Sequence, residues 1–259
     1  MTTPAESPGK VTVDINIGCN EWKLQGRITI AAGLVTVGEL LPVAWMLSDA
    51  IVKESVKVLD EMGSPISCKK GCGACCRNLV AISQPEARRL RQLVEELPEP
   101  RRSAIRARFS ATLEKFATAG LLGQLRKSDD LSDDEYGELA QAYFDQKVAC
   151  PFLEEESCSI YAERPTTCRE YLVTSPAENC SRPTADTVRR VRLPLKVFNA
   201  VARWQTPPAV HVLERWVPLI LALEWAEAHP NDPPARPGQE LLRELLDNLT
   251  GKTTTEARS

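Results

Sequence analysis

Residues 68–76 read CKKGCGACC and place four cysteines within nine positions: Cys68, Cys72, Cys75 and Cys76. Four of the other five cysteines follow later in the chain, at Cys150, Cys158, Cys168 and Cys180. Thiolates repel one another and lose solvation when a fold crowds them. A fold that gathers so many therefore needs a metal ion, an iron-sulfur cluster or disulfide bonds to hold them together.

Disulfide bonds are the competing explanation, because eight cysteines in four pairs make a framework typical of secreted proteins. The start of the chain argues against secretion, since Met1 to Lys10 has neither the basic beginning nor the apolar core of a signal peptide. A chain of 259 residues that is 43% hydrophobic can also build its core without covalent cross-links. We therefore expect a cytoplasmic protein with reduced thiols.

The longest apolar run near the C-terminus, Trp216 to Leu223, is flanked by Arg215 and Glu224 and interrupted by Pro218. It is far shorter than the roughly 20 residues that cross a bilayer. The sequence therefore predicts no membrane span.

Charge gives the chain no overall attraction to nucleic acid, because its formal net charge is −3. Arginines do gather between residues 88 and 108, but glutamates between residues 95 and 114 accompany them, which is the pattern of a solvated helical face. Phe109 is the only aromatic residue of that region, whereas nucleic-acid platforms need several for base stacking. We expect no nucleic-acid partner, and no motif identifies a protein partner.

Two alternating stretches open the chain, at residues 11–17 and 22–30, and Gly18 to Glu21 between them suits a hairpin turn. A helical pattern follows from about Leu41 to Met62, where apolar residues recur mostly at steps of three and four. Gly63 ends this helix just before the first cysteines.

Further helices are predicted on both sides of the later cysteines. Capping boxes beginning at Ser83 and Ser132 open two of them, which run to about Leu97 and toward Val148. Another helix lies between these two and ends at about Thr118. After Pro194, proline-rich breaks separate three more helices. The first ends at about Trp204, the second spans about 209–228 and the third about 238–249.

Residues 150–180 are predicted to be loop-rich, with short strands at 150–153 and 158–161 around the turn Glu154 to Ser157. Such a segment has little core of its own, so ligation by its cysteines would order it. The expected fold is mainly α with short β-hairpins, an α+β arrangement of helices around a loop-rich cysteine core at about 65–182. We expect one domain over residues 11–250, with disordered ends at 1–10 and 251–259.

The spacing Cys72-x2-Cys75 lets two sulfurs reach one metal from a tight turn, and Gly71 and Gly73 supply the backbone freedom that such a turn needs. Cys75 and Cys76 are adjacent, and neighbouring side chains usually point apart. One of them can therefore serve a second metal or bridge two irons. Eight thiolates permit either two sites of four ligands or one cluster with spare thiols.

The ligand chemistry is dominated by sulfur, because the only histidines, His211 and His229, lie far from the cysteines in sequence and are interpreted as ordinary helix residues. A shell of sulfurs favours zinc or iron-sulfur over magnesium or calcium. Structural zinc commonly uses two compact cysteine pairs, whereas here a dense quartet joins distant cysteines, so we expect an iron-sulfur cluster in preference to zinc. Cys19 stands apart in the predicted hairpin turn and is expected to be a free thiol.

Cations flank the cysteines and would offset the negative charge of a tetrathiolate complex. They are Lys69, Lys70, Arg77, Arg164 and Arg169.

A further argument comes from the combination of motifs over about residues 65–182. They are Cys68-x3-Cys72-x2-Cys75-Cys76, Cys150-Pro-Phe-Leu, Cys158-Ser-Ile-Tyr, Arg164-Pro-x2-Cys168-Arg169 and a later Cys180. This combination resembles the CxxCxxCC, or YkgJ-type, family of zinc- or iron-chelating proteins. The resemblance implies metal binding at Cys68, Cys72, Cys75, Cys76, Cys150, Cys158, Cys168 and Cys180. The chain departs from the family's label in the first gap, which has three residues instead of two.

The resemblance leaves the reaction open, because the family is often labelled as iron-sulfur oxidoreductases and a related pattern occurs in flagellin lysine methylases. The sequence contains no GxGxxG, P-loop, HExxH or GxSxG motif. One hypothesis is a protein whose iron-sulfur cluster or zinc has a structural or electron-transfer role. The other is an iron-sulfur-dependent enzyme that carries out redox chemistry or modifies protein side chains.

Overall fold

The computed structural model describes residues 9–128, 131–184, 186–204 and 216–251. The predicted class, mainly α with short β-hairpins, is confirmed: helices dominate, and four pairs of strands are each antiparallel. The ends predicted to be disordered lie outside the described residues except for residues 9, 10 and 251.

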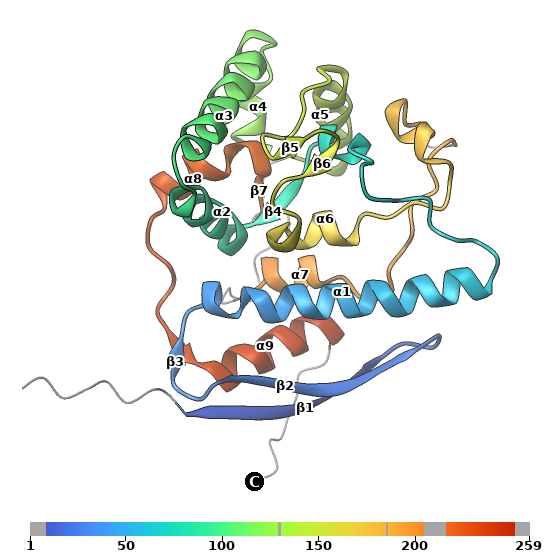
Figure 1. The fold of residues 1–259 in the computed structure, drawn as a ribbon, viewed down its shortest axis with the longest axis vertical. Helices are drawn as coiled ribbons and strands as arrows, with labels where there is room; N and C mark the ends of the chain where they lie inside the picture. The colour runs from blue at the N-terminus through green and yellow to red at the C-terminus, as the bar shows by residue number, and fades with distance from the viewer. Residues whose placement is uncertain (1–8, 129–130, 185, 205–215, 252–259) are drawn as a thin grey trace, which may run out of the picture.

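The N-terminal hairpin is confirmed as β1 (Lys10–Gly18) paired with β2 (Lys23–Ala31). Alternate side chains point to opposite faces of a strand, and here Ile15 and Ile17 of β1 join Ile28 and Ile30 of β2 in the core. This apolar face packs toward α1 (Val37–Glu61), which crosses the middle of the molecule in Figure 1.

Helix α1 begins four residues before the predicted start at Leu41. The reason is a capping box that the sequence analysis missed: the backbone N–H of Glu39 donates to the Thr36 hydroxyl at 3.3 Å, and the Thr36 N–H donates to the Glu39 carboxyl at 2.7 Å. Pro42 consequently lies inside the helix.

One core surrounds α1. The hairpin and α9 (Gly238–Thr250) lie on one side of this helix and α6 (Thr166–Glu170) lies on the other, while α7 (Val197–Ala202) packs against both α1 and α9 (Figure 1). The Trp204 indole N–H donates to the Leu241 carbonyl at 2.9 Å, which ties the end of α7 to α9. The predicted helix at 238–249 is confirmed, and the one ending near Trp204 is confirmed as the shorter α7. Two-residue strands β3 (Leu34–Val35) and β8 (Arg236–Pro237) close this layer.

A second core lies beyond α6. It is built by α2 (Gln84–Glu96), α3 (Arg101–Thr118), α4 (Leu122–Leu125), α5 (Asp133–Asp145) and α8 (Ala222–Ala228). Both predicted capping boxes are confirmed at the N-termini of α2 and α5. Phe116 of α3 is completely buried and stacks on Tyr143 of α5 with ring centroids 4.4 Å apart.

The helix predicted at about 209–228 is wrong over residues 216–221; residues 209–215 lie outside the described part of the chain. β7 (Trp216–Pro218) pairs with β4 (Ala81–Ser83) and is followed by a 3-10 turn, η6 (Leu219–Leu221), before α8 begins. Every residue from 216 to 222 is buried, so the apolar run fits a strand and turn covered on all sides. Pro218, which has no N–H to donate, ends the strand.

The arginines of α2 and α3 form ion pairs with glutamates, as the mixed charge pattern predicted. Arg89 pairs with Glu96 at 3.1 Å and Arg102 with Glu99 at 2.9 Å, while Arg106 pairs with Glu95. No helix in the described ranges is both long and apolar enough to span a membrane.

Candidate metal centre

All nine cysteines lie in the described part of the chain, and each carries a free thiol. Eight of them come from loops and very short elements around α6, as the loop-rich prediction for residues 150–180 required. The elements that contain cysteines are η1 (Ala74–Arg77), β6 (Ser157–Cys158), α6 and η4 (Ala177–Ser181), and β6 is flanked by β5 (Leu153–Glu154) and η3 (Tyr161–Glu163). Cys180 is buried and the other seven are half-buried.

Cys19 lies apart from this region, next to the turn of the β1–β2 hairpin. Its thiol donates to the Glu21 carboxyl at 2.8 Å. The sulfur therefore has a local partner within the hairpin.

The loop 68–76 folds as two successive tight turns. The Cys72 N–H donates to the Lys69 carbonyl and the Cys76 N–H to the Gly73 carbonyl, both at 3.1 Å. Gly71, inside the first turn, has a φ of 83°, a conformation that other residues adopt at a cost. The Cys75 thiol contacts the adjacent Cys76 sulfur instead of pointing away from it, and this hydrogen bond, together with burial, raises the pKa of Cys75.

This loop is fastened to the β5–β6 hairpin by backbone and side-chain contacts. The Cys150 N–H donates to the Cys76 carbonyl at 2.7 Å, and the Arg77 guanidinium donates to both carboxyl oxygens of Glu156, at 2.6 and 3.0 Å. A Cβ on Gly73 would lie 2.5 Å from Glu156 Oε2 and 2.9 Å from Leu153 Cδ1. Glycine at position 73 is therefore what allows the hairpin to approach so closely.

The hairpin itself turns sharply between its two cysteines. Glu155 and Glu156 both have positive φ, which matches the two-residue loop of a tight hairpin. Its strands are shorter than predicted and begin only at Leu153.

Backbone amides point at the hairpin sulfurs. Burial raises the pKa of Cys150 to about 12, while a hydrogen bond from the Phe152 N–H opposes that shift. Cys158 follows the same pattern, because burial raises its pKa and the Ile160 N–H donates to its sulfur. Such N–H groups stabilise a thiolate over a thiol. At both residues the backbone therefore favours the thiolate form, which is the form that binds metals.

Cys168 is positioned by a buried hydrogen-bond network at the start of α6. Glu86 Oε1 accepts from the Thr166 N–H at 2.7 Å and from its hydroxyl at 2.9 Å. Glu86 Oε2 accepts from the Ser83 N–H at 3.0 Å and from its hydroxyl at 2.7 Å. The sequence marked Glu86 as part of a capping box, but its bonds across the fold to Thr166 left no sequence signal.

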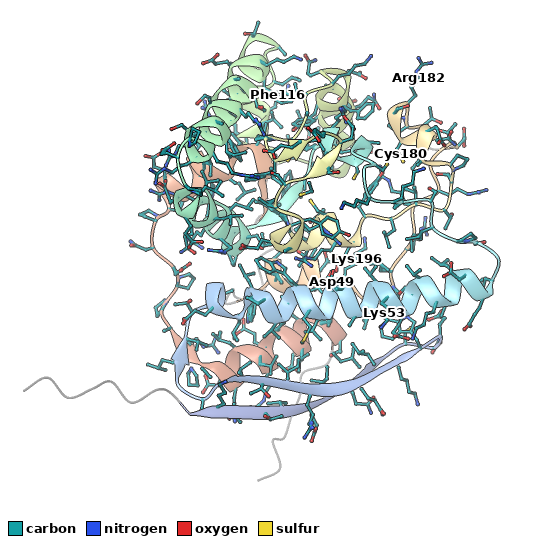
Figure 2. All side chains as sticks on the ribbon, viewed as in Figure 1. Asp49, Lys53, Phe116, Cys180, Arg182 and Lys196 are labelled. Atoms are coloured by element: carbon teal, nitrogen blue, oxygen red, sulfur yellow. The ribbon has the colours of Figure 1, made fainter. Side chains whose placement is uncertain are left out.

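Cys180 and Cys68 lie in one small apolar cluster, apart from Cys150, Cys158 and Cys168. Ser67 N–H donates to the Val173 carbonyl at 3.0 Å, and the Val173 N–H donates to the Cys68 sulfur. Cys180 packs with Val173 and Val188, and Cys68 contacts the same small apolar cluster. Figure 2 shows Cys180 to the right of Phe116 in the upper half of the molecule.

Arginines supply positive charge on both sides of the cysteines. Arg164 acts to lower the pKa of Cys75 and of Cys158, although burial and thiol contacts outweigh it and raise both. Arg169 is almost fully buried and donates to Asp49 of α1 at 2.6 Å and to the Arg164 carbonyl at 2.8 Å. Arg190, which the sequence did not indicate, likewise acts to lower the pKa of Cys180, although burial and the neighbouring thiols raise it.

The donor set fits a thiolate-bound metal, with many soft sulfurs, amides directed at them and arginines nearby. Within the described ranges, no three histidine, cysteine or acidic side chains already form a group that could hold a metal ion. Metal binding would therefore require the cysteine loops to move together, a common property of sites in which ligation and folding are coupled.

Residues 67–186 match the model of the CxxCxxCC family, described as a "putative zinc- or iron-chelating domain". The match contains all eight predicted ligands and covers somewhat less than half of the chain. It supports metal chelation by this segment. No curated protein and no solved structure matches the chain.

Proposed function

We propose that this protein binds metal through the thiolates of eight cysteines. They are Cys68, Cys72, Cys75, Cys76, Cys150, Cys158, Cys168 and Cys180. The observation that carries the proposal is the convergence of separate segments: η1 is hydrogen-bonded to Cys150, just before the β5–β6 hairpin, and η1 also packs beside η4, which contains Cys180. Once these thiols are brought together, a soft cation that replaces their protons stabilises them.

The metal's first role is to hold these segments together. The strands and helices that carry the cysteines are only two to five residues long. Elements so short bury little apolar surface, and each metal-ligand bond adds a cross-link between them. Binding free energy would then act as folding free energy for the core at about 65–182.

An iron-sulfur cluster is the form we favour, and zinc is the alternative. The ligands combine one dense quartet with distant single cysteines, which iron-sulfur ligation tolerates. The arginines near Cys75, Cys158 and Cys180 would offset the negative charge of a reduced cluster. Such a centre suits a reducing compartment, and we therefore place the protein in the cytoplasm.

The test is anaerobic purification followed by measurement of iron, zinc and acid-labile sulfide. We expect at least about one metal per chain, on the stoichiometry of thiolate coordination. Broad visible absorbance with labile sulfide would establish an iron-sulfur cluster. A colourless protein with stoichiometric zinc would reject the cluster and retain metal binding, and a protein free of both metals would reject the whole proposal.

Hydrogen exchange provides the second arm of the experiment. Removal of the metal with a strong chelator should raise exchange in residues 65–82 and 148–182 together, because both segments supply ligands. Exchange in the β1–β2 hairpin should stay unchanged. The Cys19→Ser variant is the matched control, since its sulfur already bonds within the hairpin and its loss should leave the metal content intact.

A further inference from the structure

The cysteines divide into two groups by what they pack against. Cys68 contacts the small cluster of Val173 and Val188 that also buries Cys180. Cys150, Cys158 and Cys168 instead pack against the second core, which contains Phe152 and Ile160. The packing therefore places these five cysteines in different surroundings, although one family motif spans them all.

Electrostatic interactions among the thiols follow the same division. The thiols that lie close enough to Cys180 to interact with it electrostatically are those of Cys68, Cys72 and Cys75. The thiols that lie close enough to Cys168 to interact with it are those of Cys150, Cys75 and Cys158. Cys75 is the member common to both sets.

The turn η1, which carries Cys75 and Cys76, touches both groups. Its first residue, Ala74, packs into the cluster of Cys180 and Val173. Its Cys76 carbonyl accepts the Cys150 N–H at 2.7 Å. The adjacent thiols of Cys75 and Cys76 thus stand between the two groups, in contact with one another.

Positive charge is also supplied separately. The positive charge of Arg190 attracts the Cys180 thiolate. The Arg190 guanidinium also lies 5.3 Å from the ring centroid of Tyr171, which packs against the cluster of Val173, Cys180 and Val188. The positive charges of Arg164 and Arg169 attract the thiolate of Cys158 in the other group. A centre with four thiolates and a divalent ion carries a charge of about −2, so each group has its own compensating cation.

We infer that the chain holds two metal centres that meet at the Cys75–Cys76 pair. The first centre takes three ligands from Cys68, Cys72 and Cys180, and the second takes three from Cys150, Cys158 and Cys168. The adjacent pair supplies the fourth thiolate of each. This inference rests on the proposed function and specifies how its eight ligands are shared, an arrangement that the spacing of the cysteines left open.

The test compares pairs of substitutions within one group and across the two groups. Cys158→Ser/Cys168→Ser removes two ligands from one centre and should retain about half of the wild-type metal, since a serine hydroxyl replaces thiolate poorly. Cys158→Ser/Cys180→Ser damages both centres and should retain almost none. The measured quantity is total iron plus zinc per chain after anaerobic purification, so the test applies to either metal. Equal losses in the two double variants would overturn the inference and indicate one shared cluster.

Wild-type protein provides a measurement that does not depend on the folding of variants. A chelator is added in steps, exposed thiols are alkylated, and mass spectrometry records which cysteines have lost protection. Two centres predict that Cys68, Cys72 and Cys180 gain label as one set and that Cys150, Cys158 and Cys168 gain it as another, at different chelator concentrations. Simultaneous labelling of all six would count against two centres. Metal-free wild-type protein would instead reject the proposed function, so the two failures are distinguishable.

Discussion

Replacement of the buried Glu86 tests whether the hydrogen-bond network beneath Cys168 holds the site in place. Glu86 is 1% exposed, and its two carboxyl oxygens accept four hydrogen bonds, two from Ser83 and two from Thr166. Both partners are fully buried, so water cannot replace the lost acceptor. The Glu86→Ala variant should therefore misplace the first turn of α6, which carries Cys168.

The magnitude follows from the groups left without partners. Glu86→Ala leaves the buried backbone N–H groups of Ser83 and Thr166 without acceptors, each at a cost of about 1–3 kcal/mol. It also removes the hydrogen bonds from the two hydroxyls. We expect the free energy of unfolding to fall by about 4 kcal/mol. In Glu86→Gln the amide oxygen can still accept from Thr166, while the Ser83 N–H loses its acceptor, so a loss of about 1–2 kcal/mol is expected.

Urea unfolding in a fixed metal buffer measures these losses, and competition with a chelator measures metal retention. Glu96→Ala is the matched control on the same helix, because its carboxyl pairs with Arg89 at the surface and its loss should cost at most about 1 kcal/mol. The reasoning is refuted if Glu86→Ala destabilises no more than Glu96→Ala, or if Glu86→Gln and Glu86→Ala release metal equally readily.

Four further outcomes are expected. Gly73→Ala should destabilise the protein by about 1–3 kcal/mol and weaken metal retention, because its Cβ would lie 2.5 Å from a carboxyl oxygen of Glu156, whereas Gly123→Ala, with open space around its Cβ, should retain metal normally. Thr36→Ala should cost about 1 kcal/mol in urea unfolding through loss of the α1 cap and leave metal content unchanged. Phe116→Ala should cost about 3–5 kcal/mol in the same assay, because the ring is completely buried. Metal content measured after equilibration from about pH 8 to about pH 5 should fall, because thiolate ligands regain protons as the pH drops.

The elements that the sequence predicted well are those whose signals are local. The alternation of the N-terminal strands and the capping box at Ser83 each involve residues within a few positions, and the structure has both. The helix predicted across residues 216–221 failed because its apolar run is buried by contacts with β4, which lies far away in sequence. Helix and strand cannot be separated by periodicity when every side chain of a short segment is buried.

Glu86 shows the same limit within the candidate site. Its bond to the Ser83 N–H belongs to a three-residue motif and was readable, whereas its bonds to Thr166 join positions 80 residues apart. The second role could not be predicted, because it depends on α6 packing against the start of α2.

In the proposed two-centre arrangement, the sharing of ligands depends on loop packing and not on cysteine spacing. Cys72 and Cys75 have the separation of two ligands to one metal, yet Cys75 also interacts with Cys150 and Cys168 on the other side of η1. The deciding contacts are the Cys76 carbonyl with the Cys150 N–H, and the ion pair of Arg77 with Glu156, which bring the hairpin to the loop. A chain with identical cysteine spacing but without these contacts would retain the motif. Its Cys150, Cys158 and Cys168 would no longer be held close to η1. In the proposed arrangement the motif supplies the ligands, and the packing of the hairpin determines how many centres they can build.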